Sequence, residues 1–138
     1  MKERLSAPDA IRFALATIIA HAVIVSLHSA AHQILGVQAS PAQLFFIVII
    51  IMLAPLAAGL LLWKRMRTAG ALLLAASMAG SLIFGVYNHF VVLSPDHVSH
   101  VGLLPQRFWA LTFQITAVFL VLIEATGIWA GMRTLKTT

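Results

Sequence analysis

Apolar residues dominate this chain in four long runs, and the polar residues fall mainly between them. The runs cover approximately residues 10–35, 41–63, 69–91 and 107–132. Each run reaches about 20 helical residues, the length that crosses the hydrocarbon core of a bilayer. The pattern predicts an all-α integral membrane protein, in which residues 1–138 form one four-transmembrane-helix up-down-up-down bundle with an external link over residues 92–106.

The ends of the runs carry residues that are typical of helix boundaries. Ser6 is a candidate N-cap for the first helix, and Gly36 is a plausible C-cap at its end. Ser40 and Gln43 have the spacing of a capping box, which predicts the start of the second helix. Pro55 lies in the middle of that helix and predicts a kink there.

The overall composition supports a membrane protein and excludes several kinds of site. Hydrophobic residues make up 61% of the chain and charged residues only 9%, with a mean hydropathy of +0.98. The chain has no cysteine. Disulfides, cysteine-ligated zinc and iron–sulfur clusters are therefore excluded.

The basic residues are distributed unevenly between the two sides of the predicted membrane. Eight of the nine fall on the side of the chain ends and of the turn between the second and third helices, namely Lys2, Arg4, Arg12, Lys64, Arg65, Arg67, Arg133 and Lys136. Only Arg107 lies on the other side. This asymmetry predicts that both termini are cytoplasmic. It also makes the lipid bilayer, and not a nucleic acid, the expected partner of the positive charge.

Three histidines lie within the first apolar run, in the stretch HAVIVSLHSAAH at residues 21–32. An α-helix turns by about 100° per residue, so His21, His28 and His32 share a stripe about 40° wide. Ionisable residues inside membrane helices are costly and are usually functional. The stripe therefore indicates one wall of an internal polar site.

The only acidic residue inside a predicted span is Glu124. It lies nine residues before Arg133, and His21 lies nine residues after Arg12. At 1.5 Å per residue, both should lie about 13 Å from the cytoplasmic anchors. We expect His21 and Glu124 to form a pair that supports the site or handles protons, without binding a metal themselves.

The remaining histidines should gather at the external end of the bundle. His89 ends the third run, and a short turn beginning at Ser94 and Pro95 should carry the histidines of the link. The expected metal ligands are His28, His32, His89, His97 and His100. The expected supporting residues, besides His21 and Glu124, are Gln114, Asn88 and Asp96.

Imidazole ligands without cysteine suit copper, zinc or non-haem iron. The sequence thus predicts a transition-metal-binding membrane protein with a histidine-rich site on the external, periplasmic side, with redox or hydrolytic chemistry as candidate reactions. It does not decide whether the protein is an enzyme. One alternative is an electron-transfer subunit that holds b-type haem between His28 or His32 and His89, or a quinone near Glu124. The other is a non-catalytic membrane subunit or small carrier with a polar core.

Two further features concern partners and location. Gly127 and Gly131 in GIWAG form a candidate helix-contact face for a homodimer or a larger membrane complex. The segments YNHF and SPDHVSH resemble parts of small bacterial membrane proteins, a resemblance that implies no activity. We expect a multi-pass protein of a bacterial-type inner (plasma) membrane.

Overall fold

The computed structural model describes residues 6–137, and every regular element in this range is a helix. In chain order the elements are α1 (Ala7–Leu35), α2 (Pro41–Phe46), η1 (Ile47–Leu53), α3 (Ala54–Trp63), α4 (Arg67–Val86), η2 (Tyr87–Val91), α5 (Val98–Val101) and α6 (Arg107–Leu135). Four continuous helical stretches are long and apolar enough to cross a membrane: Ala7–Leu35, Pro41–Trp63, Arg67–Val91 and Arg107–Leu135. They match the predicted runs to within a few residues. Lys2 and Arg4 lie outside the described residues.

The predicted helix boundaries are confirmed by their hydrogen bonds. Ser6 caps α1, where its side chain accepts a bond from the backbone N–H of Asp9. Gly36 ends α1 in the left-handed conformation, with a φ of 69°. Ser40 and Gln43 make both bonds of the capping box that starts α2. Local sequence therefore fixes the connection between the first two spans.

The second span contains a π-helix, η1, directly before Pro55. Proline has no backbone N–H, and its ring crowds the preceding turn, so the helix must adjust locally. A wider π turn is one such adjustment in membrane helices. The irregularity expected at Pro55 therefore takes the form of a π segment.

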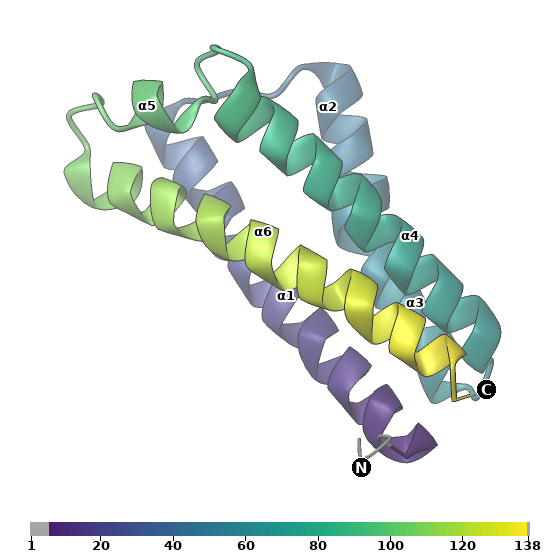
Figure 1. The fold of residues 1–138 in the computed structure, drawn as a ribbon. Helices are drawn as coiled ribbons and strands as arrows, with labels where there is room; N and C mark the ends of the chain where they lie inside the picture. The colour runs from purple at the N-terminus through teal and green to yellow at the C-terminus, as the bar shows by residue number, and fades with distance from the viewer. Residues whose placement is uncertain (1–5, 138) are drawn as a thin grey trace.

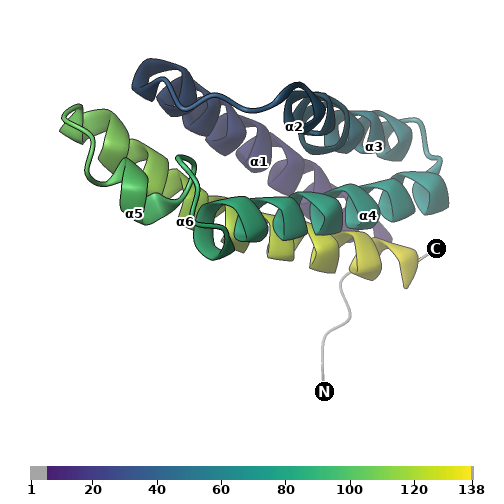
Figure 2. The same cartoon turned by 90° about the horizontal axis from the view of Figure 1, so that it is seen from above.

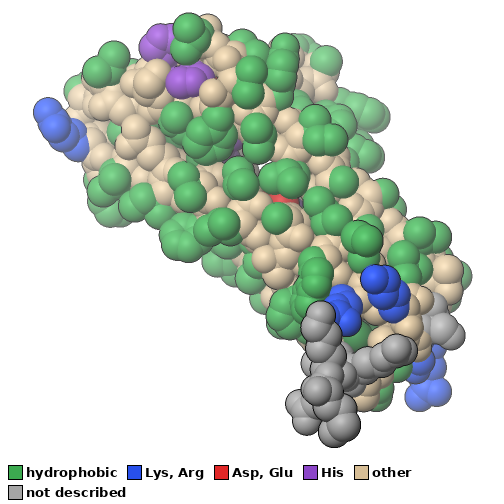
Figure 3. Space-filling model, viewed as in Figure 1, with side chains coloured by type: hydrophobic (Ala, Val, Ile, Leu, Met, Phe, Trp, Pro, Cys, Tyr) green, Lys and Arg blue, Asp and Glu red, His purple; other side chains and the backbone are tan. Residues whose placement is uncertain are grey.

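The spans form an elongated bundle (Figure 1). The start of α1 and the end of α6 lie at one end, and the link that contains α5 lies at the other. In both views, α1 and α2 are separated where residues 36–40 connect them (Figure 2). Most of the visible basic side chains lie at the end opposite the visible histidines, and apolar side chains are spread over the whole visible surface (Figure 3). Large apolar residues such as Ile83, 71% exposed, suit contact with lipid.

The two glycines of GIWAG face α4 within the chain. A Cβ atom at Gly131 would lie 2.8 Å from the backbone oxygen of Ala71, and one at Gly127 would lie 2.6 Å from Cγ of Met78. Both glycines are buried. They permit the close approach of α6 to α4, so a homodimer would have to use a different surface.

Candidate metal centre

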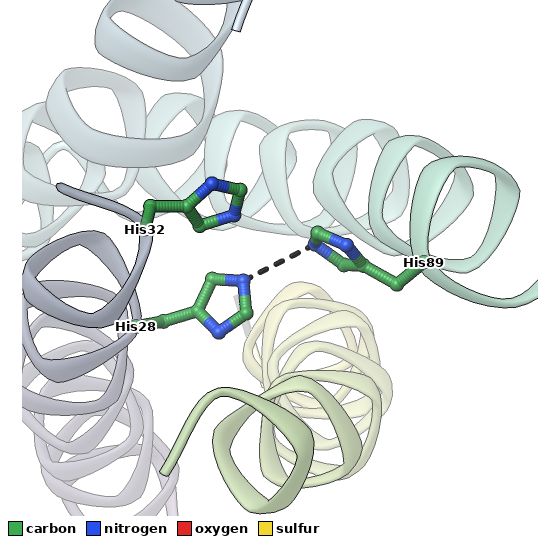
Figure 4. A group of neighbouring side chains, drawn as sticks. All are labelled: His28, His32 and His89. Atoms are coloured by element: carbon green, nitrogen blue, oxygen red, sulfur yellow. Dashed lines mark hydrogen bonds between the residues drawn. The ribbon is translucent and has the colours of Figure 1, made fainter. Parts of the chain in front are cut away.

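Three histidines from two spans meet inside the bundle (Figure 4). His28 and His32 come from α1 and His89 from η2, and the three offer ligand nitrogens that all lie within 4.8 Å of one another. His28 and His89 are buried and His32 is partly buried. Nε2 of His28 lies 3.2 Å from Nε2 of His89. The side chains of these three residues are called the triad below.

The helix that carries His89 leaves the α-helical form just before this residue. The N–H of Val92 bonds the oxygen of Tyr87, five residues earlier, at 2.9 Å. This spacing defines a π turn, which inserts one extra residue and rotates the following side chains relative to an α-helix. The sequence pattern did not predict this segment. The π turn orients His89 toward the two histidines of α1.

Each imidazole of the triad is anchored through its Nδ1 atom to a protein oxygen. His32 Nδ1 lies 3.1 Å from the backbone oxygen of Val37, and His89 Nδ1 lies 3.1 Å from that of Asp96. His28 Nδ1 lies 2.8 Å from Oγ1 of Thr116. Since a carbonyl oxygen only accepts hydrogen bonds, His32 and His89 must carry hydrogen on Nδ1.

The same assignment holds for His28, because the hydroxyl hydrogen of Thr116 is already in use. Thr116 Oγ1 donates to the backbone oxygen of Thr112 at 2.6 Å, so toward His28 it acts as an acceptor. All three imidazoles therefore donate from Nδ1 and leave Nε2 free to accept. Nε2 of His28 and Nε2 of His89 lie at hydrogen-bonding distance (Figure 4), and with hydrogen on both Nδ1 atoms this contact needs an added proton or a cation between the two lone pairs. A cation between them resolves this contact, and anchoring through the second ring nitrogen is the usual environment of metal-binding histidine.

A carboxylate lies next to the triad. Asp96 Oδ1 is 3.2 Å from His32 Nε2 and 3.3 Å from His89 Nδ1. The N–H of His89 points at the backbone oxygen of Asp96, so the buried Oδ1 receives no well-aligned hydrogen bond. Burial alone would raise the pKa of Asp96, but the contact with His89 and the nearness of His32 lower it below its ordinary value of 3.8. Asp96 is therefore a carboxylate at neutral pH, as a fourth metal ligand must be.

An aromatic ring packs against all three imidazoles. The ring centroid of Phe113 lies 4.5 Å from that of His28, 4.8 Å from that of His32 and 5.2 Å from that of His89. Phe113 is fully buried. It fixes the ring positions and limits access of water from α6.

The two histidines of the link lie apart from the triad. His97 caps α5, with Nδ1 at 2.7 Å from Oγ of Ser99, and His100 is exposed, with Nδ1 at 2.6 Å from the backbone oxygen of Ser94. Within residues 6–137, the group of side chains close enough to hold an ion contains neither of them. The helical turn begins only at Val98, later than the Ser94–Pro95 start that the sequence suggested. The link thus brings Asp96, and not His97 or His100, next to the triad.

Asn88 and Gln114 hold the surrounding backbone in place. Asn88 accepts a hydrogen bond from Gln43 at 3.0 Å, which connects η2 to α2. Gln114 donates to the backbone oxygen of Val98 at 2.9 Å, which connects α6 to the link. These bonds position the segments that carry the triad and Asp96.

His21 and Glu124, which the sequence predicted to lie at the same depth, have neighbouring side chains in the structure. His21 Nε2 lies 3.5 Å from Oε1 of Glu124, and both residues are only 2% exposed. His21 is seven residues before His28 on α1, so the pair lies about 10 Å from the triad along the bundle.

A cavity of about 690 Å³ joins the two polar sites. Its lining includes the triad, Asp96 and Glu124 and apolar side chains of α1, η1 and α4. It also includes the uncharged polar residues Ser29, Gln33, Gln38, Gln43 and Ser81. This volume is typical of sites for small molecules. An ion at the triad would therefore border an open space large enough for a second molecule.

The sequence indicated the three histidines of the triad but not the groups that hydrogen-bond to them or pack against them. Thr116 and the backbone oxygen of Val37 were not singled out, and neither was Phe113. Backbone acceptors leave no signal in a sequence. Thr116 did leave a weak one, as a hydroxyl residue in an apolar helix near the level of Gln114.

No protein-family model matches this chain, and neither a curated protein nor a solved structure matches it.

Proposed function

We propose that this chain is an integral membrane protein that binds one divalent transition-metal ion, of the zinc, copper or iron group, through Nε2 of His28, His32 and His89. The observation that carries the proposal is the anchoring of all three Nδ1 atoms to protein oxygens, which leaves three acceptor nitrogens facing one small volume. Neutral imidazole presented in this way is the common form of a histidine ligand.

The distances between the ligand atoms support a bound metal ion. Two nitrogens of a tetrahedral site with bonds of about 2.1 Å lie about 3.4 Å apart. Nε2 of His28 and Nε2 of His89 are already 3.2 Å apart. Asp96, adjacent to His32, is the candidate fourth ligand, and the cavity supplies an open coordination position. Three nitrogens with an open position are typical of catalytic and transfer sites rather than closed structural ones.

The same contacts favour an ion over b-type haem. A haem iron holds its two axial imidazoles on opposite sides of the porphyrin plane. The rings of His28 and His89 are in direct contact, with centroids 4.9 Å apart. A porphyrin between them would require the first and third spans to separate.

The first test is the metal content of the purified full chain. We expect about one equivalent of zinc, copper or iron per chain by elemental analysis, and no Soret band in the absorption spectrum. The identity of the bound metal decides between redox chemistry, which copper and iron support, and hydrolytic chemistry, which zinc supports. A chain that takes up none of the three metals after treatment with each would contradict the proposal, and a Soret band would favour the haem alternative.

The orientation is part of the proposal and has its own test. Arg65 lies in the turn between α3 and α4, and Arg67 starts α4, at the same end as Arg133 near the end of α6. Arg107 starts α6 at the opposite end. This distribution predicts a cytoplasmic location for both ends of the chain and an external location for the triad. A reporter that is active only outside the cytoplasm should give no signal when fused to either end. A strong signal at the C-terminal fusion would contradict this orientation.

A further inference from the structure

The composition of the cavity walls indicates which class of molecule could bind next to the metal site. At one end lie the triad and Asp96, and about 10 Å deeper lies Glu124. Between these groups the walls are mainly apolar, with Val25, Ile51 and Phe84 among them. A ligand that fills this space must combine an apolar body with a polar head group.

Exposed residues of the second span line one part of the cavity, and the exposed Gln33, Gln38 and Ala39 line another. Leu44, Val48 and Met52 line the first part from α2 and η1, and they are 56%, 38% and 38% exposed. These residues belong to a span with a mean hydropathy of 2.9, so their exposed surface faces the hydrocarbon region. The divergence of α1 from α2 lies on the same side (Figure 2). A ligand that passes this first part would therefore enter from the membrane.

The histidine and carboxyl groups that face the cavity offer hydrogen-bond acceptors, and the amides of Gln33, Gln38 and Gln43 line it beside them. The three Nε2 atoms of the triad accept, as the hydroxyl and carbonyl partners of their Nδ1 atoms require. Glu124 extends its Oε2 atom toward Gly85, where a Cβ would lie only 3.9 Å away and where the missing side chain leaves space. Asp96 adds a second carboxyl group. The imidazole acceptors and the carboxylate of Asp96 attract a group that donates, and Asp96 disfavours an anionic head group beside the triad.

We infer that the cavity binds a lipophilic hydroxyl compound, of the phenol, quinol or long-chain alcohol class, with its O–H directed at Asp96 or Glu124 and, where an ion occupies the triad, its oxygen toward that ion. A neutral O–H satisfies the acceptors, the apolar body fills the walls, and the bilayer delivers the molecule. The inference deepens the proposed function and rests on it in part, because it names the class of molecule that would approach the bound ion.

The test measures the binding of three probes to the purified full chain in lipid nanodiscs, with and without added metal. The probes are para-octylphenol, its methyl ether and octanoate. We expect the phenol to bind at least about tenfold more tightly than the ether, which lacks the donor, and than the anionic carboxylate. Ligand-observed NMR or calorimetry can measure this difference on the unaltered chain.

A matched pair of variants locates the binding. Val48 and Ile49 are neighbours on η1 and are 38% and 39% exposed, but only Val48 lines the cavity. Val48→Trp should fill the opening and weaken phenol binding by at least about tenfold, whereas Ile49→Trp should leave it unchanged. Equal binding of the phenol and the ether, or equal effects of the two variants, would overturn the inference.

The two metal conditions separate this inference from the proposed function. Selective phenol binding by a chain that takes up no metal would support the cavity assignment and contradict only the metal proposal. Metal uptake by a chain that shows no preference for the phenol would overturn the cavity assignment alone.

Discussion

Replacing His28 with alanine should remove most of the bound metal. Nε2 of His28 lies 3.2 Å from Nε2 of His89, and the loss of His28 leaves two imidazoles and the carboxylate of Asp96. Loss of a residue that merely orients a metal ligand typically weakens binding by 10- to 100-fold, so loss of a ligand should exceed about 100-fold. Metal analysis after dialysis against a weak chelator measures the effect. His32→Ala and His89→Ala should behave alike.

Two further variants make this prediction specific. His100→Ala removes an exposed histidine of the link and should leave metal content unchanged. Thr116→Val keeps the shape of the side chain but removes the oxygen that accepts from His28 Nδ1, and it should weaken binding by about 10- to 100-fold. Full metal content in the triple alanine variant of the triad would show that any bound ion lies elsewhere.

Much of the fold follows from local sequence. Ser6, Gly36 and the pair Ser40 and Gln43 set helix ends through bonds that span three or four residues, so reading along the chain finds them. The apolar runs are equally local. A bilayer requires every backbone group to be bonded within its own segment, which leaves helices as the form for such runs.

The candidate site was predictable where it depends on helix geometry. His28 and His32 lie one turn apart on α1 and face the same interior because the α-helix has a fixed angle per residue. The adjacency of His21 and Glu124 followed from counting residues to the basic anchors. The first deduction uses the fixed rotation per residue of an α-helix and the second its fixed rise per residue, and neither depends on tertiary packing.

The rest of the site depends on contacts between segments that are distant in sequence. The π turn at Tyr87–Val91 redirects His89, and no periodicity in the chain indicates it. The link folds so that Asp96 approaches the triad and His97 caps α5, an outcome determined by partners on α1, η2 and α6. The GIWAG motif shows the same limit, because the partner of a small-residue face can be a helix of the same chain or of another.

The pair formed by His21 and Glu124 should contribute strongly to stability. Both side chains are 2% exposed, and their ionisable atoms are 3.5 Å apart in an apolar interior. Removal of one partner of such a pair leaves the other buried without compensation. His21→Leu should therefore lower the free energy of unfolding by about 3 kcal/mol, as measured by thermal or denaturant unfolding in a fixed detergent.

A double-mutant cycle separates this effect from simple loss of packing. The double variant, His21→Leu with Glu124→Leu, replaces both polar groups with apolar ones and should recover most of the lost stability. Glu124→Gln retains a hydrogen-bonding group of nearly the same shape and should cost less than about 1 kcal/mol. Additive effects of the two leucine substitutions would show that the side chains do not interact.

The same variants decide whether the pair serves the metal or only the fold. His21 and Glu124 lie about 10 Å below the triad, too far for either to coordinate an ion there. Glu124→Gln should therefore keep full metal content while altering any activity that moves protons, because glutamine cannot exchange a proton as a carboxyl group can. Loss of metal in Glu124→Gln would instead make Glu124 a ligand. If the variant matches the unaltered chain in every proton-linked assay, Glu124 serves only as a polar contact between α1 and α6.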